Sequence, residues 1–335
     1  MGIENRMYRI FRMIRVEEWL FSKIPFMFVP LFTYIHTYGL YHGNYGLGLC
    51  LQYFIFIVTF YGFGYAINDF SDKEIDRKAG KENVMGEISP AAGVLVLGVL
   101  VTGCAPFLAM HLSVRTALLF AAVYFWGAAY SVRPFRFKER GIAGLLVSSL
   151  AQRSLPLLPL AGADARMWKG VLLWGTVGFL TGLRYILIHQ YEDMENDRQT
   201  GTRTFVNARN GGIASIIGAC LCLELFLVSA AGIYGRMAGY WIGLAACLAL
   251  SVPVFYTVHY IYRKSYFASF LCVPLEDLYN FYLPLAWLLV FAQAQPLWAA
   301  PVAVLLLAGW GKMCRKWGMA YFGITHWRKS GNGRN

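Results

Sequence analysis

Charged side chains are scarce in this sequence of 335 residues, because Asp, Glu, Lys and Arg together make up only 14% of it. A soluble domain carries about 25%, whereas 58% of this chain is hydrophobic. Apolar runs of about 20 residues, long enough to span a bilayer as helices, follow one another with only short hydrophilic segments between them. The scarcity of charge excludes a soluble domain and predicts an all-α, polytopic membrane protein. We expect one domain over residues 1–335, with a first half of about 1–140 and a second of about 141–335.

Several common functional motifs are absent as well. The seven cysteines are scattered and form no C-x-x-C pair, so neither a zinc site nor a disulfide framework is indicated. The sequence contains no P-loop, no G-x-G-x-x-G segment and no Ser-His-Asp constellation. Functions that depend on these motifs are therefore not predicted.

The apolar runs predict nine or ten membrane-spanning helices. The count is open by one because the last two runs could form a single span and a re-entrant segment. The predicted helices lie at roughly 20–40, 47–67, 91–111, 116–131, 142–161, 168–190, 212–233, 239–261, 277–294 and 297–312.

The net charge of +12 comes mainly from Lys and Arg in alternate hydrophilic segments. By the positive-inside rule these segments face the cytosol, together with both chain termini. Basic residues near membrane helices also attract anionic lipid headgroups. Nucleic acid is not a predicted partner, because the basic residues are spread over short loops rather than gathered on one folded face.

One acidic phrase occurs twice on the predicted cytosolic side. Residues 72–80 and residues 193–201 both fit the pattern D-x-E-x-D-R-x-x-G, and each follows an apolar run directly. Asn68, Asp72 and Asp76 are spaced by four residues, so successive side chains shift by only about 40° around a helix and form one stripe. Asp193 and Asp197 repeat the last two positions of this stripe.

These carboxylates need a positive partner. Gly80 and Gly201 stand where a helix would stop, which puts the acids near helix C-termini, where the helix dipole disfavours negative charge. Like charges four residues apart also repel one another. A single pair of this kind is typical of solvated residues at a helix end. Two matching pairs favour bound Mg²⁺, which takes oxygen ligands from carboxylates and from substrate phosphates.

At these positions the chain resembles the UbiA superfamily of intramembrane prenyltransferases. That family carries N-D-x-x-D-x-x-x-D after its second helix and D-x-x-x-D after its sixth, and residues 68–76 and 193–197 match these motifs at the same places. Residues 130–138 look like the family's basic loop between helices four and five, and residues 15–25 are similar to its entry into the first helix. The resemblance covers about residues 12–260, and a tenth helix would exceed the family's usual nine.

The resemblance implies transfer of a prenyl group from an isoprenoid diphosphate to an aromatic or quinone-precursor acceptor, with Mg²⁺ as cofactor. It implies that Asp72, Asp76, Asp193 and Asp197 are the catalytic, metal-binding carboxylates, and that Asn68 assists them in binding metal and substrate. The basic residues expected to bind substrate are Lys23, Arg77, Lys81, Arg133, Arg136, Lys138, Arg198 and Arg203.

Arg184 is a further candidate for substrate binding. It lies inside a predicted helix, about two and a half turns before Asp193. Because an arginine within the membrane is costly and usually faces a polar interior, we expect it to line the substrate cavity, with a salt bridge as the alternative. The chain departs from the family at residues 81–83, where Lys-Glu-Asn stands in place of Arg-Pro. Lys81 is the expected replacement for that contact.

Other functions remain open from the sequence. A relative with the same fold could use phosphoribosyl diphosphate with a polyprenyl phosphate, or cyclise a prenyl chain as a terpene cyclase does. A cation-coupled transporter would also carry acidic pairs, but near the bilayer midplane. We expect a multi-pass protein of a bacterial inner membrane with its active site toward the cytosol. Its expected partners are membrane lipids, an isoprenoid diphosphate and a lipophilic or aromatic acceptor.

Overall fold

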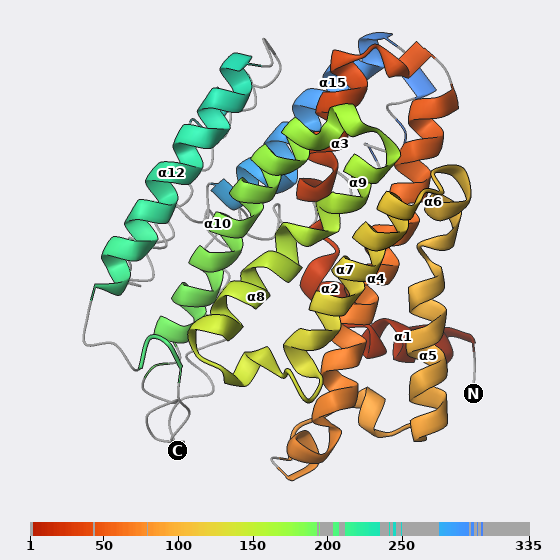
Figure 1. Cartoon of the computed structure of the whole chain (residues 1–335), viewed down its shortest axis with the longest axis vertical. Helices are drawn as coiled ribbons and strands as arrows, with labels where there is room; N and C mark the ends of the chain where they lie inside the picture. Colours follow the sequence, from red (N-terminus) through yellow and green to blue (C-terminus); the bar gives the residue numbers. More distant parts are fainter. Residues whose placement is uncertain are drawn as a thin grey trace. The chain divides into compact units, whose positions relative to one another are not determined.

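The computed structural model describes residues 3–42, 44–78, 80–192, 194, 204–207, 212–234, 241, 244–245, 249, 275–294, 296–297, 300 and 303 (Figure 1). The regular structure of these residues is entirely helical, as the sequence predicts. The chain divides into two compact units, Met1–Val228 and Ser229–Asn335. The single domain expected over residues 1–335 stays a prediction.

The first unit contains most of the described helices. It begins with α1 (Ile3–Met13), α2 (Val16–Trp19), α3 (Ile24–Thr37), η1 (Leu40–His42), α4 (Asn44–Lys78), η2 (Val84–Gly86), α5 (Pro90–Thr102), α6 (Ala105–Met110) and α7 (Val114–Ser131). It continues with η3 (Phe137–Glu139), α8 (Ile142–Arg153), η4 (Leu155–Leu157), α9 (Leu158–Ala163), η5 (Ala165–Met167) and α10 (Trp168–Glu192). The helix α12 (Ile213–Tyr234) starts in this unit. In the second unit a π-helical turn, η6 (Leu278–Tyr282), leads into α15 (Leu283–Ala294).

Four described segments are long and apolar enough to cross a membrane, judged by length and composition. They are Asn44–Lys78, Pro90–Met110, Ala165–Tyr191 and Ile213–Ile233. The helix α3 is a shorter apolar segment. Most of the predicted spans at 239–261 and 297–312 lies outside the described residues, so the count of nine or ten helices stays a prediction.

The predicted continuous helix at 142–161 is wrong, because the structure breaks it after Arg153. The helix α8 ends there, a 3-10 turn follows, and α9 resumes at Leu158. Pro156 and Pro159 account for the break, since proline lacks an amide hydrogen and its ring clashes with the carbonyl group four residues earlier.

The helix α4 is longer than predicted, because it continues past residue 67 through the acidic segment to Lys78. Gly80 has a positive φ of 66°. Its amide donates to the Arg77 carbonyl at 3.3 Å, and the Lys81 amide donates to the Asp76 carbonyl at 2.9 Å. These two bonds form a Schellman cap, in which glycine tolerates the left-handed conformation. The predicted helix stop at Gly80 is confirmed.

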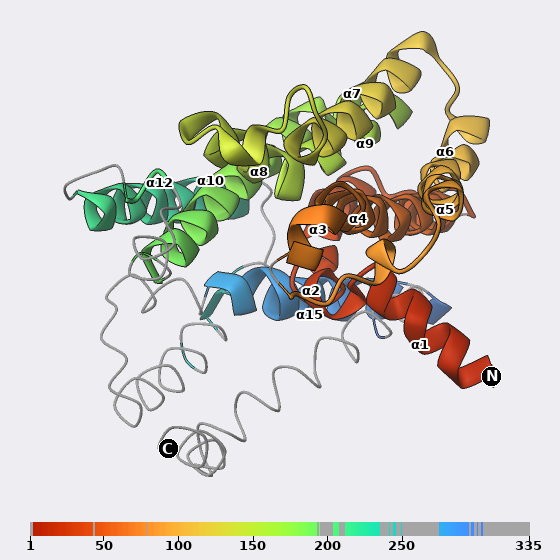
Figure 2. The same ribbon diagram turned by 90° about the horizontal axis from the view of Figure 1, so that it is seen from below.

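The helices α8 and α10 pack side by side (Figure 2). A Cβ atom on Gly178 would lie 2.5 Å from the Arg153 carbonyl oxygen, and one on Gly182 would lie 3.0 Å from Ser149 Cα. These two glycines, four residues apart on α10, let the two backbones approach closely, as small residues do in membrane helix pairs. The contact fixes the position of α8, whose Ser148 and Gln152 line a cavity in this unit.

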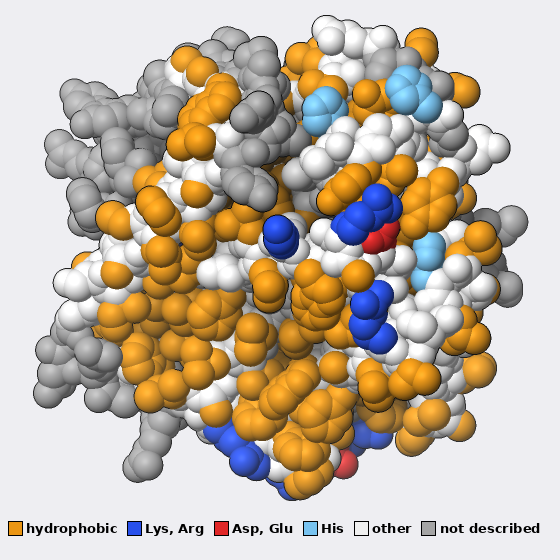
Figure 3. Space-filling model, turned by 45° about the horizontal axis from the view of Figure 1, so that its top comes forward, with side chains coloured by type: hydrophobic (Ala, Val, Ile, Leu, Met, Phe, Trp, Pro, Cys, Tyr) orange, Lys and Arg blue, Asp and Glu red, His pale blue; other side chains and the backbone are white. Residues whose placement is uncertain are grey.

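Apolar side chains cover much of the outer surface of the first unit. On α5, Val94, Leu95 and Val99 are each at least 60% exposed, and Leu118 on α7 is 65% exposed. Figure 3 shows broad hydrophobic areas on one face of the molecule, with few charged side chains among them. Exposed apolar surface of this extent fits contact with lipid rather than with water.

Candidate active site

One end of the first unit brings together the acidic segment and the basic loop. In Figure 1 the end of α4, the loop from α7 to α8 and the crosswise helix α1 lie together at the lower end. At the opposite end, the Tyr34 hydroxyl in α3 donates a 2.5 Å hydrogen bond to Asp164, just before α10. Since α4 also starts near that end, α4 and α10 both run toward the acidic segment. Asp193 and Asp197 lie outside the described residues, so the expectation that both acidic phrases lie on one side of the membrane stays a prediction.

A cavity of about 640 Å³ opens at this end. Asn68, Asp72 and Asp76 line it from α4, together with the neighbouring Asp69. The stripe of Asn68, Asp72 and Asp76 that the four-residue spacing predicts therefore faces a single cavity. Charged residues from other segments that line the same cavity include Arg12, Arg15, Lys81 and Glu82.

The loop between α7 and α8 holds both carboxylate oxygens of Asp72. Arg136 Nη2 donates to Asp72 Oδ1 at 2.7 Å, and Lys138 Nζ donates to Asp72 Oδ2. Arg136 also donates to Glu139 at 2.5 Å and to the Ser131 carbonyl oxygen at 3.2 Å. Its backbone is left-handed, with a φ of 38°, which costs an L-residue about 1–2 kcal/mol. These three contacts hold the strained residue against Asp72.

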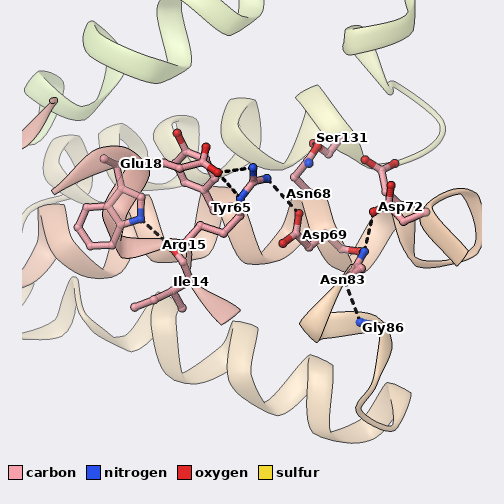
Figure 4. A network of polar contacts seen from close by, with 12 residues as sticks. Ile14, Arg15, Glu18, Tyr65, Asn68, Asp69, Asp72, Asn83, Gly86 and Ser131 are labelled. Carbon is pink, nitrogen blue, oxygen red and sulfur yellow. Dashed lines mark hydrogen bonds and ion pairs between the residues drawn. The ribbon is translucent and has the colours of Figure 1, made fainter. Parts of the chain in front are cut away.

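Asn68 belongs to the same network (Figure 4). Its Oδ1 accepts from Lys138 Nζ at 3.0 Å and from Ser131 Oγ at 2.9 Å. Burial lowers the pKa of the Lys138 ammonium, and the hydrogen bond to Asp72 opposes that shift. The side chains of Lys138 and Asp72 are 15% and 16% exposed, so solvent screens their ion pair less than a surface pair.

The segment after α4 folds back on the acidic stripe through Asn83 (Figure 4). The Asn83 side-chain nitrogen donates to Asp76 Oδ2 and to the Asp69 carbonyl oxygen, both at 2.7 Å. Its side-chain oxygen accepts from the Gly86 amide at 2.9 Å. The departure from the family pattern at residues 81–83 therefore supplies a direct contact to the second carboxylate of the stripe. Arg15 contacts Asp69 Oδ1 at 3.4 Å.

Asp69 and Asn83 were not among the site residues predicted from the sequence. Asp69 follows Asn68 directly, but on a helix it lies about 100° away from the stripe. Asn83 belongs to the stretch at 81–83 that departs from the family pattern, but its contacts depend on how the chain turns back after Gly80, which the sequence does not show.

The remaining basic candidates are distributed differently. Arg77, Lys81 and Arg133 are exposed, and of these three Lys81 lines the cavity. Lys23 lies in a second, adjoining cavity. The candidates Asp193, Asp197, Arg198 and Arg203 lie outside the described residues, so their roles stay predictions.

Arg184 forms the salt bridge that was the alternative to substrate binding. Its guanidinium donates to both carboxylate oxygens of Glu224 in α12, at 3.1 and 3.2 Å. Both side chains are 0% exposed, and neither residue lines the two cavities named here. A substrate contact by Arg184 stays a prediction that the structure does not test.

The oxygen atoms on the α4 wall fit a magnesium ion chemically. Asp72, Asp76 and Asn68 offer carboxylate and amide oxygens, and Mg²⁺ typically binds one or two carboxylates together with water and substrate phosphates. In the part of the chain that the structure describes, no group of three or more His, Cys, Asp or Glu side chains could hold a metal. A metal ion at this wall therefore needs further ligands, for which phosphate oxygens are suited.

The fold and the site define an intramembrane helical bundle with a polar, carboxylate-bearing cavity at one end. Among solved structures, one from a study of the biosynthesis of digeranylgeranylglyceryl phosphate synthase in membranes has a TM-score of 0.60 at 16% identity, covering 84% of this chain and 97% of that chain. A UbiA homologue from Archaeoglobus fulgidus, bound to GPP and Mg²⁺, has a TM-score of 0.54 at 16% identity, covering 89% of this chain and 99% of that chain. An apo UbiA homologue from Aeropyrum pernix K1 has a TM-score of 0.55 at 17% identity, covering 75% and 94%.

The sequence itself shows the family. The profile of the UbiA prenyltransferase family matches residues 28–273, and the chain therefore belongs to this family. No curated protein matches the sequence significantly. Family membership, together with the four long apolar helices, makes the chain an integral membrane protein of a transferase family. The resemblance stated from the two acidic motifs is confirmed.

Proposed function

We propose that this protein transfers a prenyl group from an isoprenoid diphosphate to an aromatic or quinone-precursor acceptor in the membrane, with Mg²⁺ as cofactor. The observation that carries this proposal is the cavity wall on which Asn68, Asp72 and Asp76 lie beside the cations of the α7–α8 loop. Two structures of an archaeal UbiA homologue, bound to GPP or DMAPP together with Mg²⁺, support the choice of donor and metal.

Asp72 and Asp76, assisted by Asn68, would hold Mg²⁺ on the α4 wall of the cavity. Asp193 and Asp197 are the proposed ligands on the second side. When bound, Mg²⁺ neutralises the diphosphate and stabilises negative charge on the departing pyrophosphate.

Arg136 and Lys138 are the proposed diphosphate-binding residues of the α7–α8 loop. In the structure they neutralise Asp72. With a metal ion held by Asp72, both side chains would be available for phosphate oxygens. A guanidinium can bind two phosphate oxygens in one plane, and an ammonium acts as a point charge. Lys81 and Arg15, which line the same cavity, add positive charge at its rim.

The proposed reaction breaks the bond between the prenyl C1 atom and the diphosphate oxygen, and forms a bond between C1 and the acceptor. The acceptor releases one proton, and pyrophosphate leaves. Negative charge on the leaving group grows as the C–O bond breaks, and cations that are already in place stabilise it without further reorganisation. Arg136 and Lys138 therefore act on the leaving group rather than on the prenyl carbon.

The alternative functions have less support. A transporter would place its ion-binding carboxylates near the bilayer midplane, whereas Asp72 and Asp76 lie in the last two turns of α4. A phosphoribosyl diphosphate donor or a cyclisation would use the same carboxylate wall, and no contact among the described residues favours either one.

The test uses purified protein in lipid nanodiscs, radiolabelled prenyl diphosphates of several chain lengths, Mg²⁺ and a lipid extract as the source of acceptor. We expect a labelled lipophilic product with wild type and none with EDTA. Asp72→Asn should lower the rate by about 100-fold or more, because it removes a charged metal ligand. Glu74→Gln is the matched control, since Glu74 is exposed on the same helix and does not line the cavity.

Two outcomes would contradict the proposal. One is that wild type forms no prenylated product with any donor, and the other is that Asp72→Asn retains the rate of Glu74→Gln. Labelled product from phosphoribosyl diphosphate instead of prenyl diphosphates would replace the proposal by that alternative.

A further inference from the structure

The carboxylates of Asp72 and Asp76 have different partners, although both line the same cavity. Both oxygens of Asp72 accept from cations of the α7–α8 loop. Asp76 Oδ2 accepts from the neutral side-chain amide of Asn83 at 2.7 Å. Its Oδ1 has no hydrogen-bond or ion-pair partner among the residues that the structure describes. Asp76 is therefore held at one oxygen by a neutral group, without a cation at either oxygen.

Asn83 approaches Asp76 from outside the cavity. Its neighbours Lys81, Glu82 and Val84 line the cavity, whereas Asn83 is not among the described lining residues. Figure 4 shows the Asn83 side chain between α4 and the turn that follows. The contact thus occupies Asp76 Oδ2 from behind the cavity wall and leaves Oδ1 as the oxygen that can serve a ligand in the cavity.

The orientation of the Asn83 amide is fixed by three contacts. Its side-chain oxygen accepts from the Gly86 amide at 2.9 Å. The side-chain nitrogen has two N–H donors, which the Asp76 carboxylate and the Asp69 carbonyl oxygen take. Asn83 cannot turn its oxygen toward a metal ion without breaking these bonds. It is therefore placed to hold a metal ligand rather than to act as one.

The backbone around Asn83 is anchored as well. The Gly86 amide also donates to the Asn83 carbonyl oxygen at 3.0 Å. Met85 is 0% exposed and belongs to an apolar core with residues of α4 and α5. Arg9 of α1 forms an ion pair with Glu87 at 3.1 Å. These contacts fix the position from which the Asn83 amide reaches α4.

A neutral donor suits a carboxylate that has to receive a metal ion. It restricts the orientation of the Asp76 carboxylate and does not cancel its negative charge, whereas an ammonium or guanidinium at this place would compete with the ion. Carboxylates that bind metals are commonly held by such hydrogen bonds, and loss of one typically weakens metal binding by about 10- to 100-fold.

We propose that Asn83 is a positioning residue, which holds Asp76 Oδ2 so that Oδ1 is presented to a divalent cation in the cavity. The inference rests on the proposed function, because it concerns the metal ion of the same site. Asn83 acts through Asp76, and it contacts neither the donor nor the ion.

Two variants separate positioning from local structure. Asn83 also caps the 3-10 turn η2, since its side chain accepts from the Gly86 amide. Asn83→Ser keeps this capping role, because serine is an equally good cap. It loses the contact with Asp76, because the hydroxyl oxygen lies one bond closer to the backbone than the amide nitrogen does. Ser89→Ala is the matched control, since it removes the cap of α5, where Ser89 accepts from the Ala92 amide at 3.2 Å, and leaves Asn83 in place.

The first experiment measures metal binding without turnover. Mn²⁺, which takes the same octahedral oxygen sites as Mg²⁺, is titrated into the full-length protein in nanodiscs without donor, and free Mn²⁺ is followed by its paramagnetic resonance signal. We expect wild type to bind Mn²⁺ and Asn83→Ser to bind it about 10- to 100-fold more weakly. Ser89→Ala should bind Mn²⁺ as tightly as wild type, although it loses a helix cap.

The second experiment uses the prenyl-transfer assay. Asn83→Ser should raise the Mg²⁺ concentration that gives half the maximal rate by the same factor, and leave the donor KM at saturating Mg²⁺ unchanged. Ser89→Ala should change neither constant. A general loosening of the segment after α4 would not produce this split between the metal and the donor.

The inference is overturned if wild type binds no Mn²⁺, if Asn83→Ser binds it as tightly as wild type, or if Ser89→Ala weakens binding as much as Asn83→Ser. It is also overturned if Asn83→Ser raises the donor KM at saturating Mg²⁺ without changing the metal affinity. Absence of prenyl transfer by wild type would defeat the proposed function instead, and the Mn²⁺ titration would still decide whether Asn83 positions a metal ligand.

Discussion

Replacing Lys138 by methionine should shift metal binding and donor binding in opposite directions. In the structure the Lys138 ammonium contacts Asp72 Oδ2 and lies 3.0 Å from Asn68 Oδ1. These are two of the three side chains on α4 that are proposed to hold Mg²⁺. A metal ion must displace the ammonium before it can bind Asp72, whereas the bound diphosphate gains the ammonium as a partner. The same side chain therefore opposes the metal and assists the donor.

The size of both effects follows from the burial of the contact. A hydrogen bond to a charged group contributes about 1.5–3 kcal/mol, and the discount for screening is small because the Lys138 side chain is 15% exposed. Arg136 still holds the other oxygen of Asp72 in the variant, so we take the lower value. This corresponds to Mg²⁺ binding about 10-fold more tightly to the donor-free protein, and to a donor Kd about 10-fold higher.

Isothermal titration of the protein in nanodiscs measures both constants, first with Mg²⁺ alone and then with a non-hydrolysable prenyl diphosphate analogue at saturating Mg²⁺. Lys73→Met is the matched control, because Lys73 lies on α4 with its ammonium 5.2 Å from the Phe70 ring centroid and does not line the cavity. The reasoning would be refuted if Lys138→Met bound Mg²⁺ more weakly than wild type, or if neither constant changed.

Two further predictions concern the helices behind the site. Glu224→Gln should lower the free energy of unfolding by about 3–5 kcal/mol, because it removes the carboxylate that faces the buried Arg184 guanidinium. The double variant Arg184→Met/Glu224→Leu should recover most of that loss in denaturation curves, and loss of transfer by this folded variant would show that Arg184 also serves the substrate. Gly182→Leu should cost at least about 1–3 kcal/mol, because its Cβ atom would lie 3.0 Å from Ser149 Cα. Gly175→Leu is its control, since a Cβ there has no other atom within 4 Å, and equal stability of the two variants would contradict the close packing of α8 and α10.

Local regularities of the sequence were sufficient to predict the helical character of the described residues and the acidic stripe on α4. Apolar runs without water must satisfy their backbone hydrogen bonds internally, so helices follow from composition and length. The spacing of Asn68, Asp72 and Asp76 determines that they share one face of α4, whatever that face contacts. Gly80 marks the helix end because the required left-handed conformation favours glycine. Pro156 and Pro159 account for the break after α8. The break was not predicted, because the apolar run continues through both prolines.

Contacts between segments distant in sequence were decided only by the tertiary structure. The helical repeat determines which side chains share one face of a helix, but not which other segment of the chain packs against that face. The positive charge of Arg136, Lys138 and Lys23 is equally visible in the sequence, yet the fold brings the first two to Asp72 and the third to Tyr65 and Gln152. Whether a lysine neutralises a carboxylate or donates to uncharged oxygens depends on the atoms that packing places around it, because its own chemistry is the same in both places.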